Sequence, residues 1–339
     1  MTSDQRKRKI VSLFSGAGGL DLGFRDANFD VVFALDSSGA AIETHKANFP
    51  GTESVHADLS ELGVVGLLEK VDEVLDEGEA IGVIGGPPCQ GFSRANPSRR
   101  SDDPRNRLPM LYLESVERLQ SKYKVEFVLF ENVLGLLDAK NEKTLAEIKS
   151  KLTSLGLHHH LESYCATEFG VPQRRKRVIV AAFSSPEARE AFCQPKTSDD
   201  RPTVRDTIKD LPSPAYFERN LDPESIPAHP NHWTMRPKSK RFTTDERSWS
   251  DTRSFRKLEW DEPSPTVAYG HREIHVHPEG HRRLSIYEAM LLQGFPTTFV
   301  LKGSLSEQVD QVSNAVPPPM AKAIAEATTH ALDAGAPAS

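Results

Sequence analysis

The residues around Cys89 are more typical of a loop that exposes a side chain to a ligand than of a hydrophobic core. It follows the run Gly-Gly-Pro-Pro at 85–88 and is followed by Gln and Gly. Two prolines restrict the backbone before the cysteine, whereas a cysteine that only fills a core normally lies among apolar residues of a regular element. We therefore predict that Cys89 is a nucleophile that forms a covalent bond to its substrate.

A carboxyl group ends a second apolar run of the same kind. Glu131 follows Phe127–Phe130, just as the cysteine segment follows Ile81–Ile84. Both runs are typical of buried strands, and the carboxyl ends of parallel strands meet at one edge of a sheet, where α/β proteins bind their ligands. A carboxyl held beside a nucleophile could donate or accept a proton there.

Four basic residues in a row open a further strand-like run. The segment Gln173 to Val178 reads Gln-Arg-Arg-Lys-Arg-Val. Alternation along a strand places Arg175 and Arg177 on one face and Arg174 and Lys176 on the other. One pair could therefore point into a site while the other meets phosphate or solvent. A basic run that only guards a sheet edge would not need four such residues.

The first apolar run ends in a glycine-rich turn. Residues 14–19 read Phe-Ser-Gly-Ala-Gly-Gly, and glycines let the backbone turn tightly and approach a ligand. The dinucleotide fingerprint would place another glycine where the chain has Asp21, so a bound pyrophosphate is disfavoured. Asp36 and Asp58 end the next two runs, and each could either cap a helix or bind a ribose. Together these features indicate a nucleoside cofactor without a diphosphate.

Alternating strands and helices are predicted to position these candidate site residues. Short apolar runs alternate with helical patterns over the first 180 or so residues, which predicts an α/β fold with a doubly wound, mostly parallel sheet. The predicted strands are Ile10–Phe14, Val31–Leu35, Ile81–Ile84, Phe127–Phe130 and Val178–Val180. Two capping boxes predict helix starts, Thr144 with Glu147 and Ser285 with Glu288.

The composition and the hydrophobic periodicity of the sequence change near residue 184. Prolines recur and periodicity fades, and all three tryptophans, Trp233, Trp249 and Trp260, fall in this later stretch. We predict a catalytic and cofactor-binding domain at 1–184, an irregular lobe at 185–280, and C-terminal helices at 281–339 that return to the first domain.

Composition excludes several classes of protein. The chain has 339 residues, of which 37% are hydrophobic and 27% charged, the balance of a soluble globular protein. No apolar run approaches the roughly 18 residues that span a bilayer, and the start lacks a signal-peptide core. We therefore expect a cytoplasmic protein. Three cysteines are too few for a disulfide framework or a cysteine-rich zinc site.

The chain has a net charge of −6, but acidic and basic side chains are concentrated in different segments. Residues 236–257 carry eight basic side chains against three acidic ones, and residues 52–80 carry nine acidic side chains against one basic one. This segregation suits a surface that binds a polyanion. Solvated charged loops would produce the same pattern, so charge alone leaves both interpretations open.

In their order along the chain, these segments resemble the DNA (cytosine-5) methyltransferase family. The resemblance covers almost the whole chain apart from residues 185–260. It is carried by seven pieces: the glycine turn, Pro-Pro-Cys-Gln, the loop Asp103 to Leu108, Glu131-Asn132-Val133, Gln173 to Val178, Arg283 to Pro296, and Gln311 to Val316. It implies a Rossmann-like methyltransferase fold and methylation of C5 of cytosine at a short specific site in double-stranded DNA.

The resemblance implies the cofactor S-adenosyl-L-methionine, which has a ribose and an adenine but no pyrophosphate. The positions that match the family's cofactor motifs are Phe14, Ser15, Gly16, Gly18, Gly19, Leu20, Asp36, Asp58, Leu59, Pro87, Leu108, Asn314 and Ala315.

The resemblance also implies catalytic roles. Cys89 would attack C6 of a flipped cytosine, Glu131 would bind the N3 and N4 edge, and Arg177, with Arg175, would hold O2. Residues 185–280 would recognise the target sequence. The expected DNA contacts are Gln90, Ser93, Arg94, Arg105, Arg174, Arg236, Lys238, Lys240, Arg241 and Arg272.

Two features depart from a simple match. Ser313 stands where the last motif of the family usually has glycine, although Asn314 is kept. His271, His275, His277 and His281 mix spacings of two and four, so we favour ordinary polar faces over a metal site and predict none.

The resemblance also suggests partners. We expect a restriction endonuclease that acts on the same DNA site. We expect the methyltransferase itself to be a monomer that does not bind a membrane and that associates with the nucleoid. A tRNA cytosine-5 methyltransferase is an alternative, disfavoured by the long, basic, tryptophan-bearing lobe. A catalytically inactive DNA-binding homologue is disfavoured because Cys89, Glu131 and Arg177 are all retained. A nicotinamide-dependent dehydrogenase would rest on the fold type alone.

Overall fold

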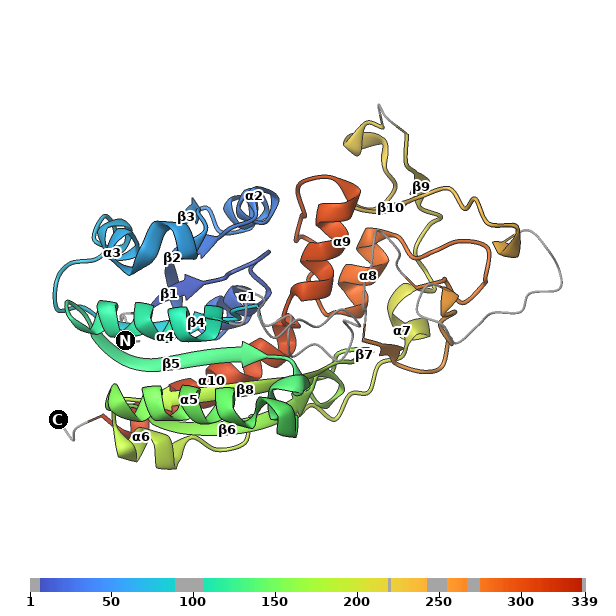
Figure 1. Ribbon diagram of the computed structural model, residues 1–339. Helices are drawn as coiled ribbons and strands as arrows, with labels where there is room; N and C mark the ends of the chain where they lie inside the picture. The colour runs from blue at the N-terminus through green and yellow to red at the C-terminus, as the bar shows by residue number, and fades with distance from the viewer. Residues whose placement is uncertain (1–6, 89–106, 219–220, 243–254, 267–274, 337–339) are drawn as a thin grey trace, which may run out of the picture. The chain divides into compact units, whose positions relative to one another are not determined.

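The computed structural model describes residues 7–88, 107–218, 221–242, 255–266 and 275–336. Spatial contacts divide the chain into two compact units (Figure 1). Unit 1 holds the chain up to Tyr164, then Lys176–Lys196 and the chain from Ala321, and unit 2 holds Cys165–Arg175 and Thr197–Met320. The two units are defined by spatial contacts and are made of segments that are distant in the sequence. The three predicted domains are continuous segments with functional roles, and that division stays a prediction.

Unit 1 is built around a seven-stranded sheet with the order β3-β2-β1-β4-β5-β8-β6. Strands β1 to β5 pair in parallel, and helices lie between them in the chain, as parallel neighbours require. The order reverses between β1 and β4, which is the position where open α/β sheets bind ligands. The strands are β1 (Lys9–Leu13), β2 (Asp30–Asp36), β3 (Glu53–His56), β4 (Ala80–Gly85), β5 (Lys124–Asn132), β6 (His158–Cys165) and β8 (Lys176–Phe183).

Strand β8 is the exception, since it pairs antiparallel with β5. Between β6 and β8 the chain forms only the 3₁₀ turn η4 (Ala166–Phe169) and the short strand β7 (Gln173–Arg174). This connection contains no crossover helix, which parallel neighbours would need. The sheet is thus mostly parallel, as the sequence predicted.

Helices cover both faces of the sheet. Gly23 of α1 lies directly against α10, because a Cβ at this glycine would stand 2.4 Å from the Cβ of Ala321. On the other face α3 and α4 pack together, and α5 packs on α4. The helices of unit 1 are α1 (Gly19–Asp26), α2 (Gly39–Asn48), α3 (Leu59–Val71), α4 (Leu108–Gln120), α5 (Glu142–Ser154), α6 (Pro186–Ala191) and most of α10 (Pro318–Ala334).

The two predicted capping boxes have different outcomes. Ser285 and Glu288 do form one at the start of α8 (Ile286–Leu292), where each side chain accepts the other's backbone N–H. The prediction for Thr144 and Glu147 was wrong, because α5 begins earlier, at Glu142. Glutamate and lysine at the two positions before Thr144 favour helix, so the threonine is already inside it.

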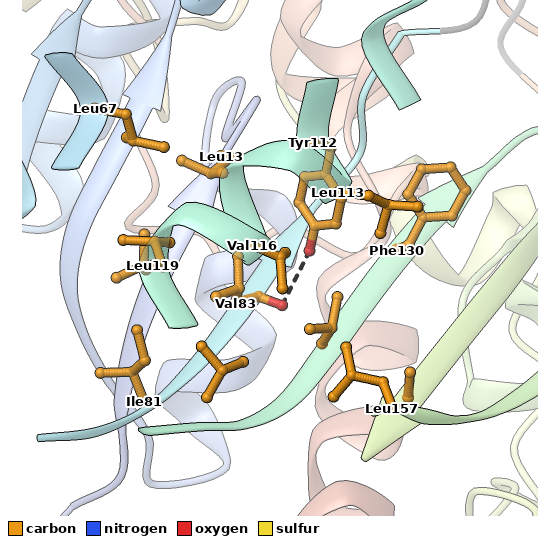
Figure 2. Packing of buried hydrophobic residues seen from close by; sticks show 14 of the residues in the cluster. Leu13, Leu67, Ile81, Val83, Tyr112, Leu113, Val116, Leu119, Phe130 and Leu157 are labelled. Atoms are coloured by element: carbon orange, nitrogen blue, oxygen red, sulfur yellow. Dashed lines mark hydrogen bonds between the residues drawn. The ribbon is translucent and has the colours of Figure 1, made fainter. Parts of the chain in front are cut away.

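Helix α4 fixes the ends of β4 and β5 from within the core. Tyr112 is fully buried, and its hydroxyl donates to the carbonyls of Val83 (3.0 Å) on β4 and Leu129 (2.9 Å) on β5. Burial raises the pKa of Tyr112 well above its usual value, so the hydroxyl remains a donor. Figure 2 shows this side chain packed beside Leu113 and Phe130. The two strands are therefore held side by side close to the residues that follow them.

Unit 2 has little regular structure, and hydrogen bonds from buried side chains hold much of its backbone. The amide of Asn231 donates to the carbonyl of Leu301 (2.9 Å) and accepts from its N–H (2.9 Å). His232 bridges the Ser285 hydroxyl and the Pro212 carbonyl. Besides η4 and β7, the elements of unit 2 are α7 (Val204–Ile208), β9 (Ala215–Tyr216), η5 (Pro223–Ser225), β10 (Trp233–Thr234), η6 (Lys240–Phe242), β11 (Ser264–Pro265), α8 and α9 (Leu305–Asn314). Within the described ranges, no helix of either unit is long and apolar enough to cross a membrane.

Candidate active site

The ends of β4 and β5 hold the segment that leads to the predicted nucleophile. Cys89 itself lies outside the described residues, but the two prolines before it are described. The amide nitrogen of Asn132 donates to the carbonyl of Pro87 at 3.2 Å. A Cβ on Gly86 would stand 3.0 Å from Oε2 of Glu131, so this carboxylate lies against the same backbone. The structure therefore brings Glu131 to the segment that carries Cys89.

Glu131 forms an ion pair with Arg177 of the neighbouring strand β8. The Nε of Arg177 lies 2.7 Å from Oε1 of Glu131, and the two side chains are 12% and 10% exposed. Burial lowers the pKa of Arg177, and the charge and hydrogen bond of Glu131 oppose that shift. The guanidinium has further N–H groups besides Nε, so the pair can offer both donors and an acceptor to a polar ligand.

The basic run alternates as predicted. Arg175 is fully buried and Arg177 is partly buried, whereas Arg174 and Lys176 are exposed. Arg174 forms an ion pair with Glu262 of unit 2. Arg175 belongs to unit 2 and Arg177 to unit 1, so a joint role for these two arginines stays a prediction.

The glycine turn after β1 is built on left-handed backbone. Phe14, Gly16 and Gly18 have φ values of 55°, 54° and 86°, a region that glycine adopts without strain. The N–H of Gly16 donates to Oδ2 of Asp36 at 2.8 Å, and the N–H of Ser38 donates to Oδ1 at 2.8 Å. The aspartate at the end of β2 thus fastens the turn that follows β1.

The surroundings of this turn fit a nucleoside. A Cβ on Gly16 would meet no heavy atom within 4 Å, so the backbone there can be approached closely. Asp36 is only partly buried, and each of its carboxylate oxygens retains acceptor capacity for a ribose hydroxyl. The buried Oγ of Ser15 has no hydrogen-bond partner among the described residues. These residues fit the ribose of S-adenosylmethionine.

The two predicted ribose acids differ in their local role. Asp36 does not cap α2, because Ser38 does so by accepting the N–H of Ala41. Asp58 is the N-cap of α3, and its Oδ1 accepts the N–H of Ser60 at 2.8 Å. The cap interpretation therefore holds for Asp58, and a contact between this exposed carboxylate and a ligand stays a prediction.

Comparison with known proteins supplies the family. Residues 8–330 match the family described as C-5 cytosine-specific DNA methylase. The chain belongs to this family. It is 33% identical over 332 residues to the Type II methyltransferase M1.HphI of Haemophilus parahaemolyticus, a match that covers 94% of this chain and 85% of that protein. It is 31% identical over 339 residues to the Type II methyltransferase M.MthTI of Methanothermobacter thermautotrophicus, covering 94% and 96%.

Solved structures show the same architecture. A DNA modification methyltransferase encoded within a prophage of E. coli superposes with a TM-score of 0.73 at 25% identity, over 96% of this chain and all of that one. DNMT2 of Spodoptera frugiperda superposes with a TM-score of 0.63 at 17% identity over 95% of this chain and 100% of that one, which concerns the fold alone. The predicted Rossmann-like fold is confirmed. The protein is an S-adenosylmethionine-dependent DNA cytosine-5 methyltransferase.

The remaining predicted cofactor residues of the methyltransferase have varied surroundings. Gly19 begins α1 and Leu108 begins α4, while Leu20 and Leu59 are buried at 6% and 1% exposure. Leu59 is part of the hydrophobic core, and its contact with the cofactor stays a prediction.

The last motif lies in unit 2. Asn314 ends α9 and is exposed, and Ala315 is 8% exposed. Ser313 lies inside the helix without a left-handed φ, and its hydroxyl donates to the carbonyl of Asp310 at 2.9 Å. Serine in place of the usual glycine is therefore compatible with this backbone. Contact of Asn314 and Ala315 with the cofactor stays a prediction.

Gln293 is a residue whose role the sequence reasoning missed. Its buried amide nitrogen donates to the carbonyls of Val312 and Ala315, each at 2.7 Å, and so fixes the break between α9 and α10. The resemblance included the segment around Gln293, but only the fold shows which backbone its side chain holds.

The basic residues of unit 2 that are predicted to contact DNA and that the structure describes are exposed. The Arg236 guanidinium lies over the ring of Tyr216, 4.6 Å from its centroid, and Lys238 and Lys240 are exposed. Their exposure is compatible with contacts to phosphates. The other predicted DNA contacts, Gln90, Ser93, Arg94, Arg105, Arg272 and the side chain of Arg241, lie outside the described residues.

Three of the four histidines that could have suggested a metal site are described, and their exposure differs. His275 and His277 are buried, His281 is exposed, and His271 lies outside the described residues. In the described part of the chain, no group of three or more histidine, cysteine, aspartate or glutamate side chains could hold a metal ion.

Proposed function

We propose that this enzyme methylates C5 of one cytosine within a short specific sequence of double-stranded DNA, with Cys89 as its nucleophile. The ion pair of Glu131 and Arg177 against the Gly86-Pro87 backbone carries the proposal. It supplies an acceptor and donors beside the backbone that leads to Cys89. The Type II names of the relatives support modification at a specific sequence.

The chemistry explains why these residue types are needed. C5 of cytosine is a weak nucleophile, and addition of the Cys89 thiolate to C6 raises the electron density on C5. Glu131 binds the N3 and N4 edge and Arg177 binds O2, so that charge developing on the ring is offset. After methylation, loss of the C5 proton to a base and departure of the Cys89 sulfur restore the C5=C6 double bond. Because C6 is unreachable inside a duplex, the cytosine must leave the stack, at a cost of a few kcal/mol.

The cofactor site follows from the glycine turn. S-adenosylmethionine, when bound, supplies an electrophilic methyl group. Asp36 accepts hydrogen bonds from the ribose hydroxyls, and the backbone at Gly16 leaves room for the ligand. Pro87 follows β4, the neighbour of β1, and its carbonyl accepts a hydrogen bond from Asn132, so the cofactor and the cytosine would meet at neighbouring strand ends.

The proposal extends to partners. Exposed basic side chains of unit 2, including Arg236, Lys238 and Lys240, would contact DNA phosphates. The enzyme would act as a monomer in the cytoplasm, associated with the nucleoid, and a restriction endonuclease would cut the same sequence when it is unmethylated. The Type II relatives support this pairing.

Bisulfite sequencing of an expressing strain tests the proposed function. We expect 5-methylcytosine at a single sequence motif in DNA, its loss with Cys89→Ser, and its persistence with Cys193→Ser, since Cys193 is an exposed cysteine elsewhere in unit 1. Methylation of tRNA without methylation of DNA would establish the tRNA alternative instead. Methylated DNA with Cys89→Ser would refute the nucleophile.

A further inference from the structure

Two exposed apolar side chains lie at neighbouring positions in unit 2, and the proposed function uses neither. Among the described residues, large hydrophobic side chains are exposed at Val65, Leu137, Phe217 and Met235. Phe217 and Met235, which are 45% and 40% exposed, both belong to unit 2. Single exposed apolar residues are ordinary, whereas neighbouring ones indicate a candidate binding surface.

The strand pair of β9 and β10 brings these two residues together. The strands run parallel, with Tyr216 opposite Thr234 (Figure 1). The N–H of Phe217 donates to the carbonyl of Thr234 at 2.8 Å, so the pairing continues beyond β9. Phe217 and Met235 are the next residues after the two strands and therefore occupy neighbouring positions.

The backbone that carries the two side chains is anchored to the rest of unit 2. The hydroxyl of Thr234 donates to the carbonyl of Leu284 at 3.0 Å. The ring of Phe217 packs against that of Trp233, which is 6% exposed, with the two centroids 5.2 Å apart. One side of the Phe217 ring is therefore held by the protein, and much of the residue remains accessible to a ligand.

Positive charge follows β10 directly. Residues 233–242 include four basic and no acidic side chains. Arg236 and Lys238 are exposed, and the Arg236 guanidinium lies over the ring of Tyr216. The acidic residue Glu218, which is exposed, lies on the β9 side instead. A polyanion would therefore bind along the segment after β10, with the apolar pair beside its charged backbone.

We propose, on the basis of the sequence specificity in the proposed function, that Phe217 and Met235 contact base edges of the DNA and help to select the methylated sequence. Arg236 and Lys238 bind phosphates beside them. The major groove admits a pair of β-strands, and the base edges there include the C5-methyl group of thymine, which apolar side chains contact. Phosphates are the same at every sequence. The apolar pair therefore acts on sequence preference and the two cations act on affinity.

Binding to two duplexes at several salt concentrations separates these roles. One duplex carries the sequence motif that bisulfite sequencing identifies, the other carries the same bases in scrambled order, and fluorescence anisotropy gives both Kd values. Phe217→Ala and Met235→Gln should each lower the preference for the motif roughly tenfold without changing the slope of log Kd against log salt concentration. Arg236→Gln should weaken binding to both duplexes equally and reduce that slope by about one. Val65→Ala, at an exposed apolar residue on α3 of unit 1, is the matched control and should change neither quantity.

The outcomes separate this inference from the proposed function. If the wild type methylates no single motif and binds both duplexes equally, sequence-specific methylation fails. If the wild type prefers the motif, and Phe217→Ala and Met235→Gln both keep that preference, only the contact of these residues with bases is refuted.

Two further results would assign the surface another role. A wild-type dimer in sedimentation that Met235→Gln converts to a monomer would assign it to a second copy of the chain and refute the inference. A lower preference of Met235→Gln together with a lower thermal unfolding midpoint would show a packing role, with the same consequence. Should Phe217→Ala unfold because its ring packs on Trp233, the preference of Met235→Gln decides.

Discussion

The two compact units place their polar side chains in opposite ways. In unit 1 an apolar core fills the space between sheet and helices, and Asp36, Glu131 and Arg177 stand at strand ends or borders where ligands can reach them. In unit 2 residues such as Asn231 and Gln293 are buried and hydrogen-bonded to irregular backbone. The difference teaches that these polar side chains of unit 1 are placed at strand ends, in line with their proposed roles, whereas those of unit 2 hold irregular backbone.

The contrast between the two units predicts the largest loss of activity for a substitution of Glu131. Glu131→Gln removes the carboxylate that would bind the cytosine edge, and we expect kcat to fall by roughly 10²–10⁴, as measured by transfer of a labelled methyl group to DNA. The matched control is Glu126→Gln, because Glu126 lies on the same strand β5 away from the site. A kcat of Glu131→Gln within tenfold of the wild-type value would refute the catalytic role of Glu131 at the end of β5.

The next effect concerns the stability of unit 2. Asn231→Ala leaves both backbone groups of Leu301 without their side-chain partner, and we expect unit 2 to lose about 2–4 kcal/mol of unfolding free energy. Hydrogen exchange should show faster opening around α8 and residues 299–301, with the sheet of unit 1 unchanged. Ser225→Ala, at an exposed hydroxyl of the same unit, should have little effect. Equal loss of protection in both units would contradict the contrast.

Acid should also destabilise unit 2 through its buried histidines. Burial lowers the pKa of His229 and of His275 to about 4, below the value of about 6.5 in an unfolded chain. The unfolded state therefore binds more protons between these values, and stability is lost as the pH falls from about 6.5 towards 4, on the order of 2 kcal/mol for each histidine. Thermal unfolding against pH should be less pH-dependent in His275→Gln than in the wild type. His281→Gln, at an exposed imidazole, should keep the wild-type dependence.

The smallest effect is predicted for the core of unit 1. Tyr112→Phe removes the hydroxyl that bridges β4 and β5 but keeps the ring, and should cost about 1 kcal/mol in denaturant unfolding. A loss larger than that of Asn231→Ala would show that unit 1 also depends on buried polar bonds, and would weaken the comparison.

Much of unit 1 could be predicted from the sequence, because its signals are local. Apolar runs such as Ile81–Ile84 mark buried strands, and Glu131 follows such a run, so the carboxyl ends could be expected to meet. The pairing of Glu131 with Arg177 could not be predicted, since it depends on β8 lying beside β5 in the antiparallel direction. A buried contact between Asp21 and His45 joins two helices, and a pattern within either helix does not indicate it.

Unit 2 was harder to predict for a physical reason. Its backbone is held by long-range side-chain bonds, such as those of Asn231 to Leu301 and of His232 to Ser285, and these leave no periodic pattern in the sequence. The capping box at Ser285, which is a local signal, was confirmed there.

Covalent trapping tests the central claim most directly. DNA that carries 5-fluorocytosine at the methylated position, incubated with enzyme and S-adenosylmethionine, cannot lose a proton from C5, so the bond between Cys89 and C6 should persist. We predict a protein–DNA band that survives denaturation with the wild type and is absent with Cys89→Ser. Transfer of methyl groups to ordinary DNA by an enzyme that gives no such band would contradict the addition of a cysteine to the cytosine ring.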